Sequence, residues 1–317
     1  MKNVTNTQPL SKNENNRVNM PKLLNPCIDP IFKAMMTDNS PEGRKALTSF
    51  ISTVIGHSIS DIELLPNELP NQNGTDKQSV FDLTCVIDGK EKANIEMQGV
   101  NIFNAYNNRV EYHVSHLMQY SVPKGLNWDK VEKVFQISVL NFIYSDFAKH
   151  KNVLTHFMMQ SDDGVHLGDR MNVFFIELPK IEQQNISIKD MTSVERWAKY
   201  FRNAADESKQ DLIQELTKYE EGIMDAQAVL NRISTNDAMW VQQKHYYDAI
   251  ARENTIISEN YEKGLNKGLA QGRSEGIALG SHAKAIETAH NLIKFGMSIA
   301  QISEATGLTI TEIKQLR

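Results

Sequence analysis

The most constraining stretch of the sequence is residues 81–98, in which apolar and polar side chains alternate on both sides of a tight turn. Alternation with a period of two is typical of a β-strand that is buried on one face only. Between the two arms, Asp88-Gly89 favours a two-residue turn in which both central residues have positive φ. The apolar positions are Phe81, Leu83, Cys85 and Ile87 in the first arm, and Ile95 and Met97 in the second. The pattern predicts a β-hairpin with one apolar and one polar face.

The polar face of this hairpin carries Asp82, Glu96 and Gln98. Two carboxylates on a rigid pair of strands offer the oxygen ligands that a hard cation such as Mg²⁺ prefers. The alternative is a solvated acidic surface, because polar residues on the outer face of a hairpin usually face water. If the two carboxylates are exposed at the edge of the sheet, their removal changes the stability by no more than about 0.5 kcal/mol.

Composition limits the class of protein. The chain has 317 residues, of which 40% are hydrophobic and 23% charged, as is typical of a soluble globular protein with one large domain or two. Its net charge of -5 gives no global basic field for nucleic acid, although a nuclease needs only a local basic track. Cys27 and Cys85 form neither a disulfide framework nor a zinc motif, and we expect Cys85 to be a reduced core residue. The sequence contains no membrane span and no secretory signal, which favours a cytoplasmic protein.

Helices and strands are predicted to alternate along the first part of the chain, after a polar tail over residues 1–24 that we expect to be disordered. Asp29 is the expected N-cap of the first helix, with Pro30 as its first helical residue. Residues 104–120 form a helix in which Arg109 shares a face with His113, and Tyr112 with His116. The other expected elements are a helix over 41–55 that ends at Gly56, a strand or connection over 59–65, a loop over 66–74, a central strand over 133–144, and strands over 156–159 and 171–178 around a turn at 162–164. This order predicts an α/β fold with a mixed sheet.

From residue 186 onward the pattern is helical. We expect a helical subdomain over 186–262, with core positions at Trp197, Phe201, Leu212, Leu216, Ile223, Leu230 and Ile233. Glycines then recur every four residues, at Gly264, Gly268, Gly272, Gly276 and Gly280. Such a Gly-rich helical connector, over 263–282, is either flexible or a close-packed oligomer interface, since glycine both weakens a helix and lets another helix approach. Residues 283–317 resemble a helix-turn-helix unit, in which Ser298 and Thr309 cap short helices around Gly307.

Several of these features together resemble one known family. They are the opening Asp29-x-x-Phe-Lys33, Lys77 before Asp82, the strand end Ile-Glu96-Met-Gln98, and Arg109 with Tyr112. The chain resembles the PD-(D/E)xK nuclease superfamily and, within it, the Rpn family of recombination-promoting nucleases and transposases. The likeness runs from about residue 25 to the glycine-rich stretch and the C-terminal unit. It implies a nuclease-like domain over 25–185 with a restriction-endonuclease-like αβββαβ core, followed by an all-helical C-terminal region.

The resemblance also implies an activity, a metal-dependent DNA endonuclease that acts on double-stranded DNA in recombination or transposition. Asp82 matches the motif aspartate and Glu96 the motif glutamate, so the two would bind Mg²⁺, or Mn²⁺, with the backbone carbonyl of Met97. Gln98 stands where the superfamily has lysine, as is usual in the Rpn form, and would orient the attacking water. The residues implied to support the DNA phosphate are Lys33, Lys77, Arg109 and Tyr112.

Three other interpretations stay open from the sequence. The protein could bind DNA with little catalysis, it could be a homo-oligomer held by its C-terminal helices, or it could be a nuclease that acts in defence against foreign DNA. Nicking of supercoiled DNA that depends on a metal ion would separate the enzyme from the first two, and salt-dependent binding without nicking would indicate the DNA-binding protein.

Overall fold

The computed structural model describes residues 23–66, 82–101, 106–122, 125 and 127–316. Residues 1–22 of the expected tail over 1–24, most of the expected loop over 66–74, and Lys77 lie outside these residues. Leu24, the last residue of the expected disordered tail, is instead buried in the main core. The chain forms two compact units, with the boundary between Tyr246 and Tyr247.

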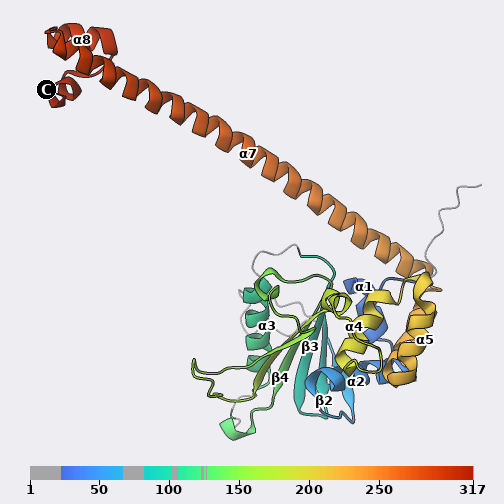
Figure 1. Ribbon diagram of the computed structural model, residues 1–317. Coiled ribbons are helices and arrows are strands. Elements are labelled where there is room, and N and C mark those ends of the chain that lie inside the picture. The colour runs from blue at the N-terminus through green and yellow to red at the C-terminus, as the bar shows by residue number, and fades with distance from the viewer. Residues whose placement is uncertain (1–22, 67–81, 102–105, 123–124, 126, 317) are drawn as a thin grey trace, which may run out of the picture. The chain divides into compact units, whose positions relative to one another are not determined.

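A six-stranded mixed sheet forms the centre of the first unit (Figure 1). Its strands are β1 (Ile62–Leu65), β2 (Leu83–Ile87), β3 (Glu91–Gln98), β4 (Val134–Leu140), β5 (Leu154–Phe157) and β6 (Met171–Glu177), in the spatial order β1-β2-β3-β4-β6-β5. The pairs β3–β4 and β4–β6 are parallel, and the other three pairs are antiparallel. Every residue of β4 is buried, as expected for a central strand covered on both faces.

The predicted hairpin is confirmed as β2–β3. Asp88 has φ +49° and Gly89 has φ +68°, and the amide of Lys90 donates to the carbonyl of Ile87, as in the predicted turn with two positive φ angles. The ladder pairs Ile87 with Glu91, so Lys90 adds one residue to the connection. Phe81 lies outside the described residues. The other apolar positions of both arms lie in the main core, which fixes the register of the pair because a slip of one residue would turn them out of it.

Helices cover both faces of the sheet (Figure 1). The apolar face packs against α1 (Asp29–Met36), α2 (Pro41–Ile55), α4 (Ser193–Asn203), α5 (Gln210–Tyr219) and α6 (Glu221–Ile233) in one large core. All seven core positions expected over 186–262 belong to this core or pack on it. The opposite face packs against α3 (Tyr106–Tyr120) in two smaller clusters. The predicted α/β fold with an αβββαβ core is therefore confirmed.

Several boundaries differ from the prediction. The central strand expected over 133–144 spans only Val134–Leu140. Asp29 is the first residue of α1, whereas the N-cap is Ile28, which makes no side-chain cap. The carboxylate of Asp29 therefore does not cap the N-terminus of α1. The strand expected over 156–159 begins two residues earlier, because Leu154 already pairs with Ile176 and the chain leaves the ladder after Phe157.

The second unit begins within α7 (Asp237–Lys294), which continues through all five glycines of the repeat as one helix. Helices α8 (Ile299–Thr306) and α9 (Ile310–Gln315) pack against the end of α7 around Ala289 and Ile302. The caps expected at Ser298 and Thr309 are present, each as a capping box, and Gly307 adopts φ +73° between the two short helices. Within the described residues, no helix is both long and apolar enough to cross a membrane.

Candidate active site

Glu96 lies near the end of β3, on the face that α3 covers. It is buried, with 1% of its surface exposed. This burial overturns the expectation that its face is solvated or lies at an exposed edge, because β3 is an inner strand and α3 covers it. Its Oε1 accepts a hydrogen bond of 2.5 Å from Nε2 of Gln98, two residues along the same face. A buried carboxylate that is fixed in this way has one defined orientation.

Helix α3 directs two side chains toward Glu96. Nη2 of Arg109 forms a salt bridge with Oε1 of Glu96, and Nδ1 of His113 lies 3.9 Å from Oε2. Arg109 and His113 are four residues apart and share a face of the helix, as the spacing predicted. The side chain of Arg109 is partly exposed while that of Glu96 is buried. The salt bridge therefore joins a buried carboxylate to a guanidinium that water can reach.

Asp82 and Asp29 complete an acidic cluster around Glu96. The register of the β2–β3 ladder pairs Leu83 with Ile95 and, continued by one residue, sets Asp82 opposite Glu96. Burial and the negative charges of Asp29 and Glu96 raise the pKa of Asp82 to about 8. Burial likewise raises the pKa of Asp29, against the opposing charges of Lys33 and Arg109. The cluster thus holds three carboxylates that destabilise one another's charged forms.

The structure brings together most of the residues singled out in the sequence. Asp82, Glu96, Gln98, Lys33 and Arg109 interact within one cluster. Tyr112 is exposed and stacks on His116, one turn further along α3, with 6.0 Å between the ring centroids. Lys77 lies outside the described residues.

Sequence reasoning missed two members of this cluster. Asp29 was assigned to the helix cap because an aspartate before proline is the usual signal for a helix start. Its place in the opening Asp29-x-x-Phe-Lys33 was the available sign of another role. His113 was placed on the correct face of its helix, yet no pattern in the sequence shows that this face covers Glu96.

The chemistry of the cluster fits a hard divalent cation. Oδ1 of Asp29 and Oε2 of Glu96 are buried carboxylate oxygens without a hydrogen-bond partner in the described part of the chain. Such oxygens are the preferred ligands of Mg²⁺ and Mn²⁺. Within the same residues, no three His, Cys, Asp or Glu side chains are already arranged to hold a metal ion. A cation would therefore be held by two of the carboxylates together with uncharged oxygen donors.

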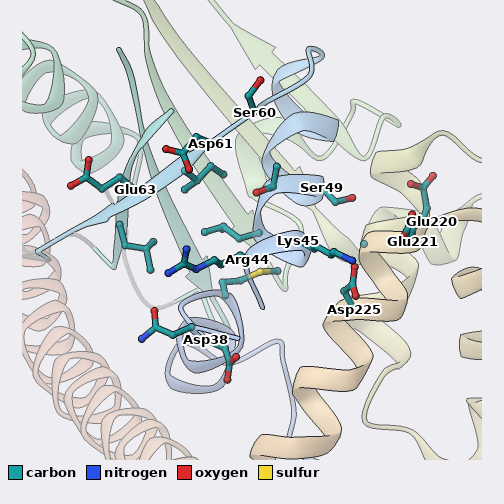
Figure 2. Close-up of a pocket in the computed structure, with 17 residues that line it drawn as sticks. Asp38, Arg44, Lys45, Ser49, Ser60, Asp61, Glu63, Glu220, Glu221 and Asp225 are labelled. Carbon is teal, nitrogen blue, oxygen red and sulfur yellow. The ribbon is translucent and has the colours of Figure 1, made fainter. Parts of the chain in front are cut away.

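A separate cleft of about 1080 Å³ lies between α2, β1 and the start of α6 (Figure 2). Figure 2 shows acidic side chains around it from β1, from the start of α6 and from the segments before α2 and β1, whereas α2 contributes Arg44 and Lys45. Its lining includes six acidic residues, Asp38, Asp61, Glu63, Glu220, Glu221 and Asp225, against two basic ones, Arg44 and Lys45. This excess of negative charge repels a phosphodiester, so the cleft is a poor candidate for the site that binds nucleic acid.

The mixed sheet, its helical layers and a buried carboxylate cluster beside an arginine define a nuclease-like α/β domain. A model of the PD-(D/E)XK nuclease family transposases matches residues 26–255, and the chain belongs to this family. Nucleases of the PD-(D/E)XK type typically use divalent metal ions. No curated protein and no solved structure matches the chain.

Proposed function

We propose that the protein is an endonuclease that hydrolyses phosphodiester bonds of double-stranded DNA with the help of Mg²⁺, in recombination or transposition. The observation that carries the proposal is the cluster of Asp29, Asp82 and Glu96 with Arg109 beside it. The raised pKa of Asp82 supports it, because carboxylates gathered against their own repulsion are frequent at functional sites and rare elsewhere.

In this proposal Asp82 and Glu96 hold the metal ion, and Asp29 adds negative charge beside them. A bound Mg²⁺ would neutralise charge that develops on the scissile phosphate and lower the pKa of a water molecule. The family match and the unpartnered Oε2 of Glu96 support this assignment, and the unpartnered Oδ1 of Asp29 lies on the carboxylate that adds the third charge. Mn²⁺ would serve the same ligands.

In this proposal Gln98 and Arg109 together replace the lysine of the superfamily motif. Gln98 orients the attacking water, and Arg109 provides the positive charge. The amide of Gln98 carries no charge, and its Nε2 donates to Glu96, so its Oε1 is the atom left to accept a hydrogen bond from the attacking water and orient it. Arg109 supplies the positive charge instead, since its guanidinium is partly exposed beside Glu96 and a guanidinium fork suits the oxygens of a phosphate. Lys33, which faces the same carboxylates, gives a second cation.

The test is nicking of supercoiled plasmid by the full-length protein with Mg²⁺, Mn²⁺, Ca²⁺ or EDTA. Glu96→Gln keeps the shape of the side chain and removes its charge. We expect this variant to lose nicking by ~100-fold or more, the order of loss when a group that stabilises a transition state is removed.

Glu91→Gln is the matched control, because Glu91 lies on the same strand and pairs with His57 away from the cluster. It should retain wild-type activity. Nicking by Glu96→Gln at the wild-type rate, or equal nicking in EDTA, would refute the assignment. Salt-dependent DNA binding without nicking by the wild type would favour a DNA-binding protein instead.

A further inference from the structure

The second unit contains a long helical surface that nothing in the described residues covers. Every residue of α7 from 254 to 284 is exposed. Five of them are glycines with no atom of another residue near the position of a Cβ atom. Each glycine weakens a helix by ~0.8–1 kcal/mol relative to alanine, so about 4–5 kcal/mol must be recovered if this segment is to be helical in solution. Packing against another helix is the usual source of such stability.

One face of α7 is largely apolar over this length, with Asn254, Ser258 and Glu275 as its polar members. With 100° of rotation per residue, Tyr247, Ile250, Ile257, Tyr261 and Leu265 fall within an arc of about 100°. Three of them are at least half exposed or close to it, with Tyr261 at 73%, Ile257 at 50% and Leu265 at 49%. The same arc continues through Gly268, Gly272, Gly276, Leu279 and Ala283. The face is therefore bulky in its first half and mostly small in its second half.

The net charge of α7 changes sign near the residue at which the apolar face changes from bulky to small side chains. Residues 247–262 hold four acids and one base, a net charge of −3, and residues 263–284 hold four bases and one acid, a net charge of +3. The helix macrodipole favours acids only near the first turn and bases only near the last, so it does not account for this division in the middle of the helix.

We propose that this face binds the same face of a second copy of the chain, with the two helices antiparallel and Leu265 at the centre. An antiparallel pair sets the bulky half of each helix against the small half of the other, and the acidic half against the basic half. It pairs Asn254 with Gly276, and Tyr247 with Ala283, over about 54 Å of helix. A parallel pair would instead oppose acidic half to acidic half and leave the glycines facing one another.

Self-association is tested on the full chain by light scattering across a range of concentrations. We expect a mass of about 72 kDa, twice the 36.0 kDa of one chain, that falls toward the monomer as salt is raised. Leu265→Glu places two like charges at the centre and should give a monomer. Ile277→Glu is the control, because Ile277 is also exposed but lies on the far side of α7 from the apolar face, and it should stay a dimer.

The orientation is tested by cross-linking cysteine variants with a short bis-maleimide. A mixture of Asn254→Cys and Gly276→Cys should give a cross-linked dimer, whereas Asn254→Cys alone should not, since the two copies of residue 254 would lie about 33 Å apart. The native cysteines are both buried, so the wild type gives the background. A monomeric wild type, a dimer unaffected by Leu265→Glu, or efficient cross-linking of Asn254→Cys to itself would overturn the proposal. None of these outcomes depends on nuclease activity.

Discussion

The charges of the acidic cluster should lower the stability of the folded protein when no metal ion is bound. A substitution that removes one charge and keeps the side-chain volume tests this. Asp82→Asn keeps the volume of the side chain and removes its ionisable group. Burial and the charges of Asp29 and Glu96 raise the pKa of Asp82 to about 8 in the folded protein, against about 3.8 for an aspartate that is exposed to water. At pH values between about 4 and about 8, the carboxyl group of Asp82 keeps its proton in the folded state and has released it in the unfolded state. The wild-type protein without metal therefore loses stability as the pH rises from about 4 to about 8.

The size of the effect follows from this shift. A difference of about 4 pKa units, at ~1.4 kcal/mol each, sets an upper limit of about 6 kcal/mol. Asp82 is only partly buried, and water and nearby cations can screen its charge, so we expect about 1–3 kcal/mol. For a folded unit of this size, 1 kcal/mol moves the Tm by ~2–4 °C.

Thermal unfolding in EDTA measures the difference across pH. At pH 8 Asp82→Asn should have a Tm ~2–12 °C above the wild type, and the two should converge toward pH 4. Added Mg²⁺ should then raise the Tm of the wild type more than that of the variant, because a ligand stabilises the state that binds it. Asp162→Asn, at the exposed turn between β5 and β6, should match the wild type throughout. A variant less stable than the wild type at pH 8, or a gap that does not grow with pH, would refute the reasoning.

Two further predictions concern packing and the role of Gln98. Gly222→Ala should destabilise the protein by about 1–3 kcal/mol, because its Cβ would lie 2.2 Å from Oγ of Ser49 on the neighbouring helix, and denaturant unfolding measures this. Gly264→Ala, where the Cβ meets nothing within 4 Å, should instead stabilise α7 by ~0.8–1 kcal/mol; equal effects would contradict the packing argument. Gln98→Lys should retain nicking, because an amine can replace the amide beside Glu96. Gln98→Ala should slow nicking and keep metal affinity in calorimetry, and loss of the metal would make Gln98 a ligand.

The local patterns of the sequence predicted the elements that position the site. Alternation gave the two arms of the hairpin and the shared face of Asp82 and Glu96, and the Asp88-Gly89 turn has the expected backbone angles. These features depend on residues that are close in sequence. The burial of Glu96 does not, because it is decided by the packing of α3, whose polar residues look like a solvated face when read alone. The premise of the small stability cost, an exposed position at the edge of the sheet, therefore does not hold for Glu96.

Asp29 is a second residue whose role the local sequence does not decide. A residue at a helix start has two competing uses, since its carboxylate can cap the helix or face another part of the chain. The local signal is identical in both cases, and the choice is made by the position of β2 and β3 relative to α1. Here Asp29 joins Asp82 and Glu96, and the helix begins without a side-chain cap. The protein thus gives up a local stabilising contact and places a third negative charge beside two others. Both changes cost stability in the absence of a cation, and both are what a site that binds one requires.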